Sequence, residues 1–284
     1  MRLSLATIDA TELSGIEKAR LNWKIYRANG GKLASALLTT STKTEKDGIG
    51  YFTRILYLQP STESGVNMCP HAGDCAQVCL SESGHMAMET IRAERNGTKT
   101  ARWKRTHYML SERESFDHDL ITEIQKHIKY CTKRSLKPVV RLNGTSDIIW
   151  DRIIRLFPGV QFYDYTKDIR RFDEWQNRKK RSKKRTNYHL TFSADEKISP
   201  HSFFLSHDTG SCAVVFDPES FKSIVKQKYI EISGKRVRIV NGDITDNRFA
   251  DPKGLNIVAL KAKGRAKKDG LRFVYHYGVG GMIY

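Results

Sequence analysis

Six short apolar runs, each ending in polar residues, recur through the C-terminal half of the chain and constrain its fold most. They cover 138–142, 160–163, 188–192, 212–216, 237–240 and 257–260. Several are followed by amphipathic helical segments, of which 148–157 is the clearest because Pro158-Gly159 halts it. Apolar strands that alternate with helices indicate a parallel sheet covered on both faces. So many units in so short a stretch predict an α/β fold built on a parallel-stranded partial (β/α) barrel.

The N-terminal part of the chain has a different pattern of apolar and polar residues. Runs 33–41 and 51–58 are expected to be strands, and the second stops at Pro60. The length of 284 residues allows one large domain or two small ones. We expect an N-terminal β-containing segment over 1–60 and a barrel-like domain over 61–284 that carries a cysteine loop.

Two helices are expected before the first of the six apolar runs. Residues 86–110 are helical by composition and carry several basic side chains. The segment 115–134 has an apolar stripe at helical spacing, and Cys131 lies on that stripe. Cys131 is therefore interpreted as a core residue, as is Cys212, which lies inside an apolar run.

Three of the chain's five cysteines, Cys69, Cys75 and Cys79, lie within eleven residues. Pro70 and Gly73 in the same run suit a tight loop. An odd number of cysteines, three of them clustered, fits ligand thiols in a reducing compartment better than a disulfide framework. Three thiolates brought together predict a metal or iron–sulfur site.

Three kinds of site fit this loop. The first is a [4Fe–4S] cluster on the three cysteines, with one iron left open to a substrate or to S-adenosylmethionine. The second is a zinc site that His71 or His85 would complete. The third is a structural loop with buried cysteines. The cysteines are separated by five and then three residues, which differs from the spacing usual in radical S-adenosylmethionine enzymes.

Charged and polar residues follow the predicted strands. We expect five of them to be catalytic: Asp147, Asp164, Lys167, Asp243 and Asp246. Because parallel strands share one carboxyl edge, these side chains would converge on a rim, where carboxylates bind a divalent cation or carry out acid–base catalysis. Cations there suit phosphate or carboxylate groups. The residues expected to bind cofactor or substrate are Asn143, Thr145, Ser193, Lys261 and Lys263.

A second interpretation applies to the acids. Aspartate after a strand often caps the next helix or makes a turn. Asp147 is a fair cap for the segment 148–157, and Asp217 before Pro218 is a better one. Asp243 and Asp246 have no clear helix after them, so a functional role fits them better.

The chain is strongly basic, with 49 Lys and Arg against 31 Asp and Glu and a net charge of +18. Such an excess favours a polyanionic partner, so we expect nucleic acid or a nucleotide; the alternative is a very soluble basic enzyme. Seven of the eight residues in 178–185 are basic. This tract is expected to be an exposed loop or helix end that contacts phosphate, or else a solvated run of charge.

The sequence also bears on location. No stretch reaches the roughly 18 apolar residues needed to cross a bilayer. The apolar run at the N-terminus is too short, and a charged residue follows it too early, for a secretory signal. We therefore expect a cytoplasmic protein with no membrane partner, and the oligomeric state stays open.

Several blocks of sequence resemble the phage gene-product-eighty-eight family. They are 56–60, 67–75 with Cys79-Leu80, 141–147, 162–167, 241–246, Arg248, 251–252 and 260–264, in this order within about 50–265. The resemblance implies a phage-encoded or mobile-element protein that works in the host bacterial cytoplasm, and it brings no firm activity. A more distant similarity to radical-S-adenosylmethionine-like phage proteins implies a three-cysteine loop after the first strand of a partial barrel.

Together these features predict a phage-encoded iron–sulfur enzyme that modifies nucleic acid or a nucleotide. The reaction would be a radical or metal-assisted modification, with S-adenosylmethionine as a further candidate cofactor. One alternative is a non-enzymatic nucleic-acid-binding protein with a structural zinc or iron–sulfur site. Another is a metal-dependent nuclease that uses the aspartates.

Overall fold

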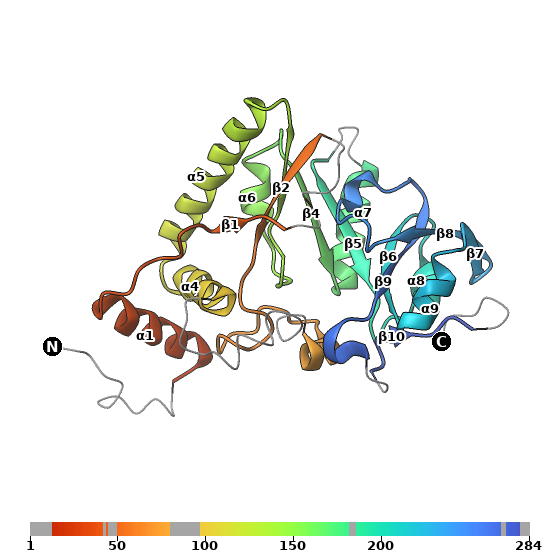
Figure 1. The fold of residues 1–284 in the computed structure, drawn as a ribbon, viewed down its shortest axis with the longest axis horizontal. Coiled ribbons are helices and arrows are strands. Elements are labelled where there is room, and N and C mark those ends of the chain that lie inside the picture. Colours follow the sequence, from red (N-terminus) through yellow and green to blue (C-terminus); the bar gives the residue numbers. More distant parts are fainter. Residues whose placement is uncertain are drawn as a thin grey trace.

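The computed structural model describes residues 13–41, 44, 50–79, 97–181, 186–267 and 271–278. Within them, ten strands form one sheet in the order β1-β2-β3-β4-β5-β6-β9-β8-β7, with β10 beside β6 (Figure 1). The strands are β1 (Leu38–Thr39), β2 (Tyr51–Leu56), β3 (Lys137–Arg141), β4 (Gln161–Thr166), β5 (Tyr188–Ser193), β6 (Gly210–Phe216), β7 (Tyr229–Ile232), β8 (Lys235–Asn241), β9 (Leu255–Lys261) and β10 (Val274–Tyr275).

The sheet is mostly parallel. All neighbours along the path from β2 to β8 pair in parallel, and so does β10 with β6. The edge strands β1 and β7 are antiparallel to β2 and β8. All six apolar runs of the C-terminal half contain strands, which confirms the predicted α/β class and the parallel sheet.

The N-terminal segment contributes to the same sheet. Of the run 33–41 only β1 is a strand, whereas β2 occupies most of the run 51–58. β2 pairs in parallel with β3, from Tyr51 opposite Lys137 to Ile55 opposite Arg141. The boundary predicted at residue 60 falls between these two neighbouring strands, and the division into two domains stays a prediction.

An α-helix directly follows each of β3, β4, β5 and β6 in the described part of the chain. The helices are α1 (Gly15–Ala28), α4 (Thr98–Ser111), α5 (Arg113–Thr132), α6 (Asp151–Arg155), α7 (Ile169–Arg181), α8 (Pro200–Ser206) and α9 (Pro218–Ile224). α5 confirms the helix predicted at 115–134, and α4 confirms the second half of 86–110, whose residues 86–96 lie outside the described residues. α9 begins as expected, because the Asp217 carboxylate accepts from the backbone N–H groups of Glu219 and Ser220.

One helix, α1, has no counterpart among the predicted elements. Its start nevertheless has a local signature, since Ser14 and Glu17 have capping-box spacing and the Ser14 N–H donates to the Glu17 carboxylate at 2.8 Å. None of the helices in the described ranges is long and apolar enough to cross a membrane.

The helices pack on one face of the sheet in two groups. α4, α5 and α6 lie against β2–β4, in a core where Phe116, Trp150 and Phe162 are almost completely buried. α7, α8 and α9 lie against β5, β6 and β9, around Phe172 and other buried aromatic side chains. Cys131 and Cys212 are both fully buried, which confirms that they are core residues.

The opposite face of the sheet is covered by the loop between β8 and β9, residues 242–254. The Phe249 ring lies 5.0 Å from the ring of Tyr51 on β2 and 5.6 Å from that of Tyr163 on β4. Thr53 donates to Asn247 Oδ1 at 3.4 Å. The β8–β9 loop therefore starts near the β7 edge of the sheet and reaches β2, which lies near the β1 edge.

Candidate active site

The cysteine loop lies across the carboxyl ends of the parallel strands. After β3, the Asp147 N–H donates to Met68 O at 2.8 Å, and the Cys69 thiol lies 3.6 Å from Thr145 O. After β5, Glu196 Oε1 accepts from the Asp74 N–H at 3.2 Å. These bonds place the loop over the edge of the sheet at which the polar residues were predicted to gather.

The path of the loop near Glu196 favours a glycine. Gly73 has a φ of +53°, and a Cβ at this position would lie 1.9 Å from Glu196 Oε1. Asp74, the next residue, is held by Arg272, whose Nε donates to Asp74 Oδ2 at 3.0 Å. A short 3-10 helix, Gly73–Val78, then carries Cys75.

The three loop thiols lie within electrostatic reach of one another. Burial raises the pKa of Cys69 to about 11, and the nearby groups that raise it further are Cys79, Asp147 and Cys75. Burial likewise raises the pKa of Cys75, while the ammonium group of Lys167 lowers it. All three thiols are half-buried rather than enclosed in the core.

Their role as metal ligands stays a prediction. Among the described residues, no three His, Cys, Asp or Glu side chains are grouped closely enough to hold a single metal ion. His71 Nε2 lies 3.5 Å from Asp168 Oδ2, and His85 lies outside the described residues.

Asp147 is fixed beside the loop by three donors. Its carboxylate accepts from Thr166 Oγ1 at 3.0 Å, from the Lys167 N–H at 2.9 Å and from Arg171 Nη1 at 2.7 Å. Burial raises the pKa of Asp147, whereas Arg171 lowers it. The interpretation of Asp147 as a helix cap is wrong, because α6 begins only at Asp151 and this carboxylate binds groups of β4 and α7 instead.

Asn143 and Asp164 form a buried pair that holds the segment after β3. Asp164 accepts from the Asn143 N–H at 2.8 Å and from its Nδ2 at 3.2 Å. Asn143 Oδ1 in turn accepts from Ser146 Oγ, the Ile148 N–H and Trp150 Nε1. Burial raises the pKa of Asp164 to about 6 despite nearby Arg171 and Arg141. Both side chains thus position the loop 143–150.

Lys167 and Thr145 complete the group under the cysteine loop. Lys167 Nζ donates to Ala194 O at 2.9 Å and lies close to Cys75. Ala194 directly follows Ser193, the last residue of β5. Thr145 Oγ1 donates to Leu58 O, and the Thr145 carbonyl oxygen lies beside the Cys69 thiol. Asp147, Lys167 and Thr145 therefore lie beside the cysteine loop at the carboxyl ends of their strands, and their roles stay predictions.

The other predicted acids have different surroundings. Asp246 lies in the β8–β9 loop, where Arg141 Nη1 donates to it at 2.6 Å and the hydroxyls of Tyr163 and Tyr165 are 3.5 and 3.4 Å away. Asp243 forms an ion pair with Lys263 at 2.9 Å. Lys261 ends β9 opposite Phe216. The carboxylates after β8 are thus bound to their own basic partners.

Sequence reasoning missed Arg171, which connects the two buried acids. Arg171 Nη2 donates to Tyr188 Oη at 2.7 Å, and Tyr188 Oη lies 3.4 Å from Asp164 Oδ2. A basic residue in a helix normally faces solvent, so its type gave no signal. The only sequence clue is its place in the first turn of the helix that follows β4.

An open, mostly parallel α/β sheet with a cysteine loop across its carboxyl edge defines the structural class of this protein. The chain belongs to the phage Gene product 88 family, whose model matches residues 23–277. This match confirms the resemblance carried by the cysteine loop and the strand-end blocks, and the family description states no activity. Comparison with curated proteins and with solved structures finds no match.

Proposed function

We propose that this protein is an iron–sulfur enzyme that modifies nucleic acid or a nucleotide, with a [4Fe–4S] cluster on Cys69, Cys75 and Cys79. One observation carries the proposal. The three thiols lie on a single loop across the carboxyl ends of parallel strands, next to Asp147 and Lys167. In open α/β sheets, ligands bind at this end of the strands.

The donor set suits such a cluster. Iron–sulfur clusters are held by cysteine thiolates, and three cysteines would leave one iron without a cysteine ligand. Each thiolate of a cubane binds a different iron, so the ligands stand further apart than the four ligands of one zinc ion. The three thiols lie within electrostatic reach of one another, which supports a shared cluster. A bound cluster would supply one-electron chemistry or an open iron.

The neighbouring side chains would bind and orient the substrate. Lys167 uses one N–H to hold Ala194 O, and its ammonium group also offsets thiolate charge near Cys75. Its remaining N–H groups suit a phosphate or carboxylate of a ligand. Asp147, held by Arg171, would present a fixed acceptor beside Cys69.

We further propose that the sheet is a partial barrel with this site at its carboxyl mouth. Consecutive strands from β2 to β6 lie side by side in sequence order and in parallel, as in barrels. The contacts of Asn247 with β2 and of Phe249 with β2 and β4 support curvature around the β8–β9 loop.

The structure favours this function over a metal-dependent nuclease. A two-metal site needs carboxylates that share cations. Here Asp147, Asp243 and Asp246 each form an ion pair with an Arg or Lys side chain.

Anaerobic purification followed by iron, sulfide and zinc analysis tests the proposal. We expect a brown protein with about four iron and four sulfide per chain, and loss of both in Cys69→Ala, Cys75→Ala and Cys79→Ala. Cys131→Ala and Cys212→Ala are matched controls, because these two cysteines are buried in the core and should leave the iron content unchanged. Colourless protein with one zinc per chain, or full iron content in all three loop variants, would contradict the proposal.

A further inference from the structure

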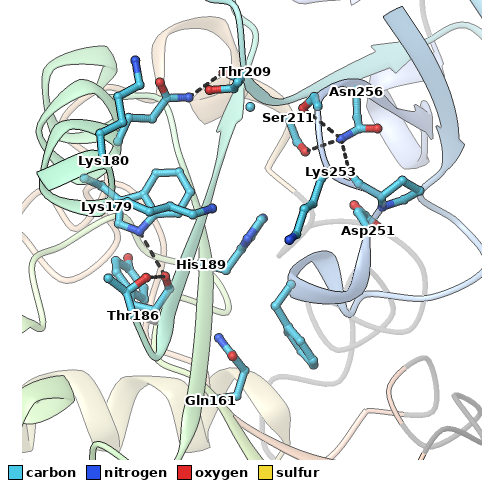
Figure 2. Close-up of a pocket in the computed structure, with 17 residues that line it drawn as sticks. Gln161, Lys179, Lys180, Thr186, His189, Thr209, Ser211, Asp251, Lys253 and Asn256 are labelled. Carbon is cyan, nitrogen blue, oxygen red and sulfur yellow. Dashed lines mark hydrogen bonds between the residues drawn. The ribbon is translucent and has the colours of Figure 1, made fainter. Parts of the chain in front are cut away.

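A cavity lies at the amino ends of the strands, at the opposite end of the sheet from the cysteine loop. Its volume is about 860 Å³, within the range of small-molecule sites. The first residues of three strands, Gln161, Tyr188 and Gly210, line it, together with α7 and the β8–β9 loop (Figure 2).

Lysines line the cavity from two sides. Lys179 and Lys180 come from α7 and Lys253 from the β8–β9 loop, and Figure 2 shows Lys179 and Lys253 pointing toward the same space. Burial and then the charge of Lys253 lower the pKa of Lys179. Within the described ranges, none of the three lysines has an acidic partner at ion-pair distance. Asp251, which also lines the cavity, is 3.5 Å from Arg248. An anion would relieve this repulsion.

Three residues that line the cavity have a buried polar atom without a hydrogen-bond partner among the described residues: His189 Nε2, Asn256 Oδ1 and Asp251 Oδ2, the last of which faces Arg248. Asn256 is only 1 % exposed, and its Nδ2 donates to Pro252 O at 2.8 Å and to Ser211 Oγ at 3.2 Å. The amide orientation is therefore set by its neighbours, and the unpaired atom is the acceptor oxygen. Native proteins rarely leave such an acceptor unsatisfied, so it indicates a ligand that donates a hydrogen bond.

Aromatic rings form another part of the lining. Trp175 and Phe249 line the cavity, and Lys179 Nζ lies 5.0 Å from the centre of the Trp175 ring. Flat apolar faces next to cations and hydrogen-bonding groups are the combination with which proteins hold nucleobases and their phosphates.

We propose that this cavity is a second ligand site and binds a mononucleotide. The phosphates would contact Lys179 and Lys253. The base would lie against Trp175 and Phe249 and donate a hydrogen bond to Asn256. The lysines at 179 and 180 belong to the basic tract that the sequence marked for phosphate contact. None of these residues touches the cysteine loop in the contacts described above, so the site does not depend on the iron–sulfur proposal.

Isothermal titration calorimetry of the full-length protein tests this site. The probes are ATP, GTP, CTP and UTP, with the matching nucleosides and inorganic triphosphate as references. We expect at least one nucleotide to bind, with about tenfold weaker binding in each of Lys179→Ala and Lys253→Ala. Lys222→Ala and Lys226→Ala, exposed lysines of α9 and the segment after it, are matched controls and should bind normally. Cys69→Ala should also bind normally, which separates this site from the cluster.

A second variant tests the aromatic wall. Phe249→Leu keeps most of the side-chain volume, and we expect it to lower the affinity for the nucleotide but not for inorganic triphosphate. Equal affinity of the wild-type protein for nucleotide and inorganic triphosphate would overturn the proposal, since that result describes an anion site. Nucleotide binding that both lysine variants leave unchanged, or no binding of any of the four nucleotides, would overturn it as well.

Discussion

At the scale of single residues, Asn143 and Asp164 show how a polar strand end can serve the fold. Both were predicted to touch ligands because they follow predicted strands. Asp164 is 1 % exposed, and its carboxylate holds the backbone and the side chain of Asn143. Asn143 Oδ1 in turn accepts a hydrogen bond from Trp150 Nε1, which holds the segment that ends at Trp150. The pair therefore sets the position of Asp147, which lies inside that segment.

Asp164 should make stability depend on pH. Burial raises its pKa from 3.8 to about 6. Between pH 3.8 and about 6 the folded state therefore keeps a proton that the unfolded state has lost. The contribution of Asp164 to stability is therefore greatest below about pH 4 and is lost as pH rises through about 6. In Asp164→Asn this titration is absent. We expect the wild-type free energy of unfolding, minus that of the variant, to fall by roughly 2 kcal/mol from pH 4 to pH 7.

Urea unfolding at intervals of one pH unit measures this difference. Asp208→Asn is the control, because its carboxylate is 91 % exposed beside Lys235 and no comparable fall is expected. A difference between wild type and Asp164→Asn that stays constant or grows with pH would show that the carboxyl group is not held in its protonated form.

At the scale of elements, β2 and the strands of the six apolar runs were predictable, whereas β7, β10 and the path of the β8–β9 loop were not. Each of the predicted strands has a local apolar pattern, and so does α5. The β8–β9 loop is held by contacts between residues far apart in the sequence, such as Thr53 and Asn247. Its own residues are polar and without periodicity, so nothing local indicates that Phe249 packs on β2. For this reason the pairing of Asp246 with Arg141, the last residue of β3, could not be predicted.

The Arg141–Asp246 pair should stabilise the placement of the β8–β9 loop. The two side chains are 16 % and 13 % exposed, so Asp246→Ala would leave a nearly buried guanidinium without its partner. We expect a loss of about 3 to 5 kcal/mol in the free energy of unfolding. Asp243→Ala is the matched control, since its partner Lys263 is 49 % exposed and such pairs contribute less than about 1 kcal/mol. Urea denaturation of both variants gives the comparison, and equal losses would refute a special role for the buried pair.

At the scale of the whole molecule, the net charge of +18 should govern association with nucleic acid. Binding that neutralises phosphates releases counterions, so the logarithm of affinity falls linearly with the logarithm of salt concentration. If about six phosphates are contacted, affinity should fall roughly a thousandfold between 50 and 200 mM salt. Fluorescence anisotropy with labelled single-stranded DNA and RNA measures the slope. Affinity that does not change with salt would contradict a polyanionic partner.

The cysteine loop and the cavity of Lys179 and Lys253 lie at opposite ends of the same strands. β4 begins at Gln161 in the cavity and ends at Thr166, next to Lys167 and the loop. Six residues in a parallel strand separate its ends by about 17 Å. If both proposed sites bind ligands, the sheet holds those ligands apart, and a mononucleotide in the cavity would not be the group that reacts beside the cysteine loop. The two ligands would then be separate molecules, or the two ends of one elongated molecule that spans the length of the strands.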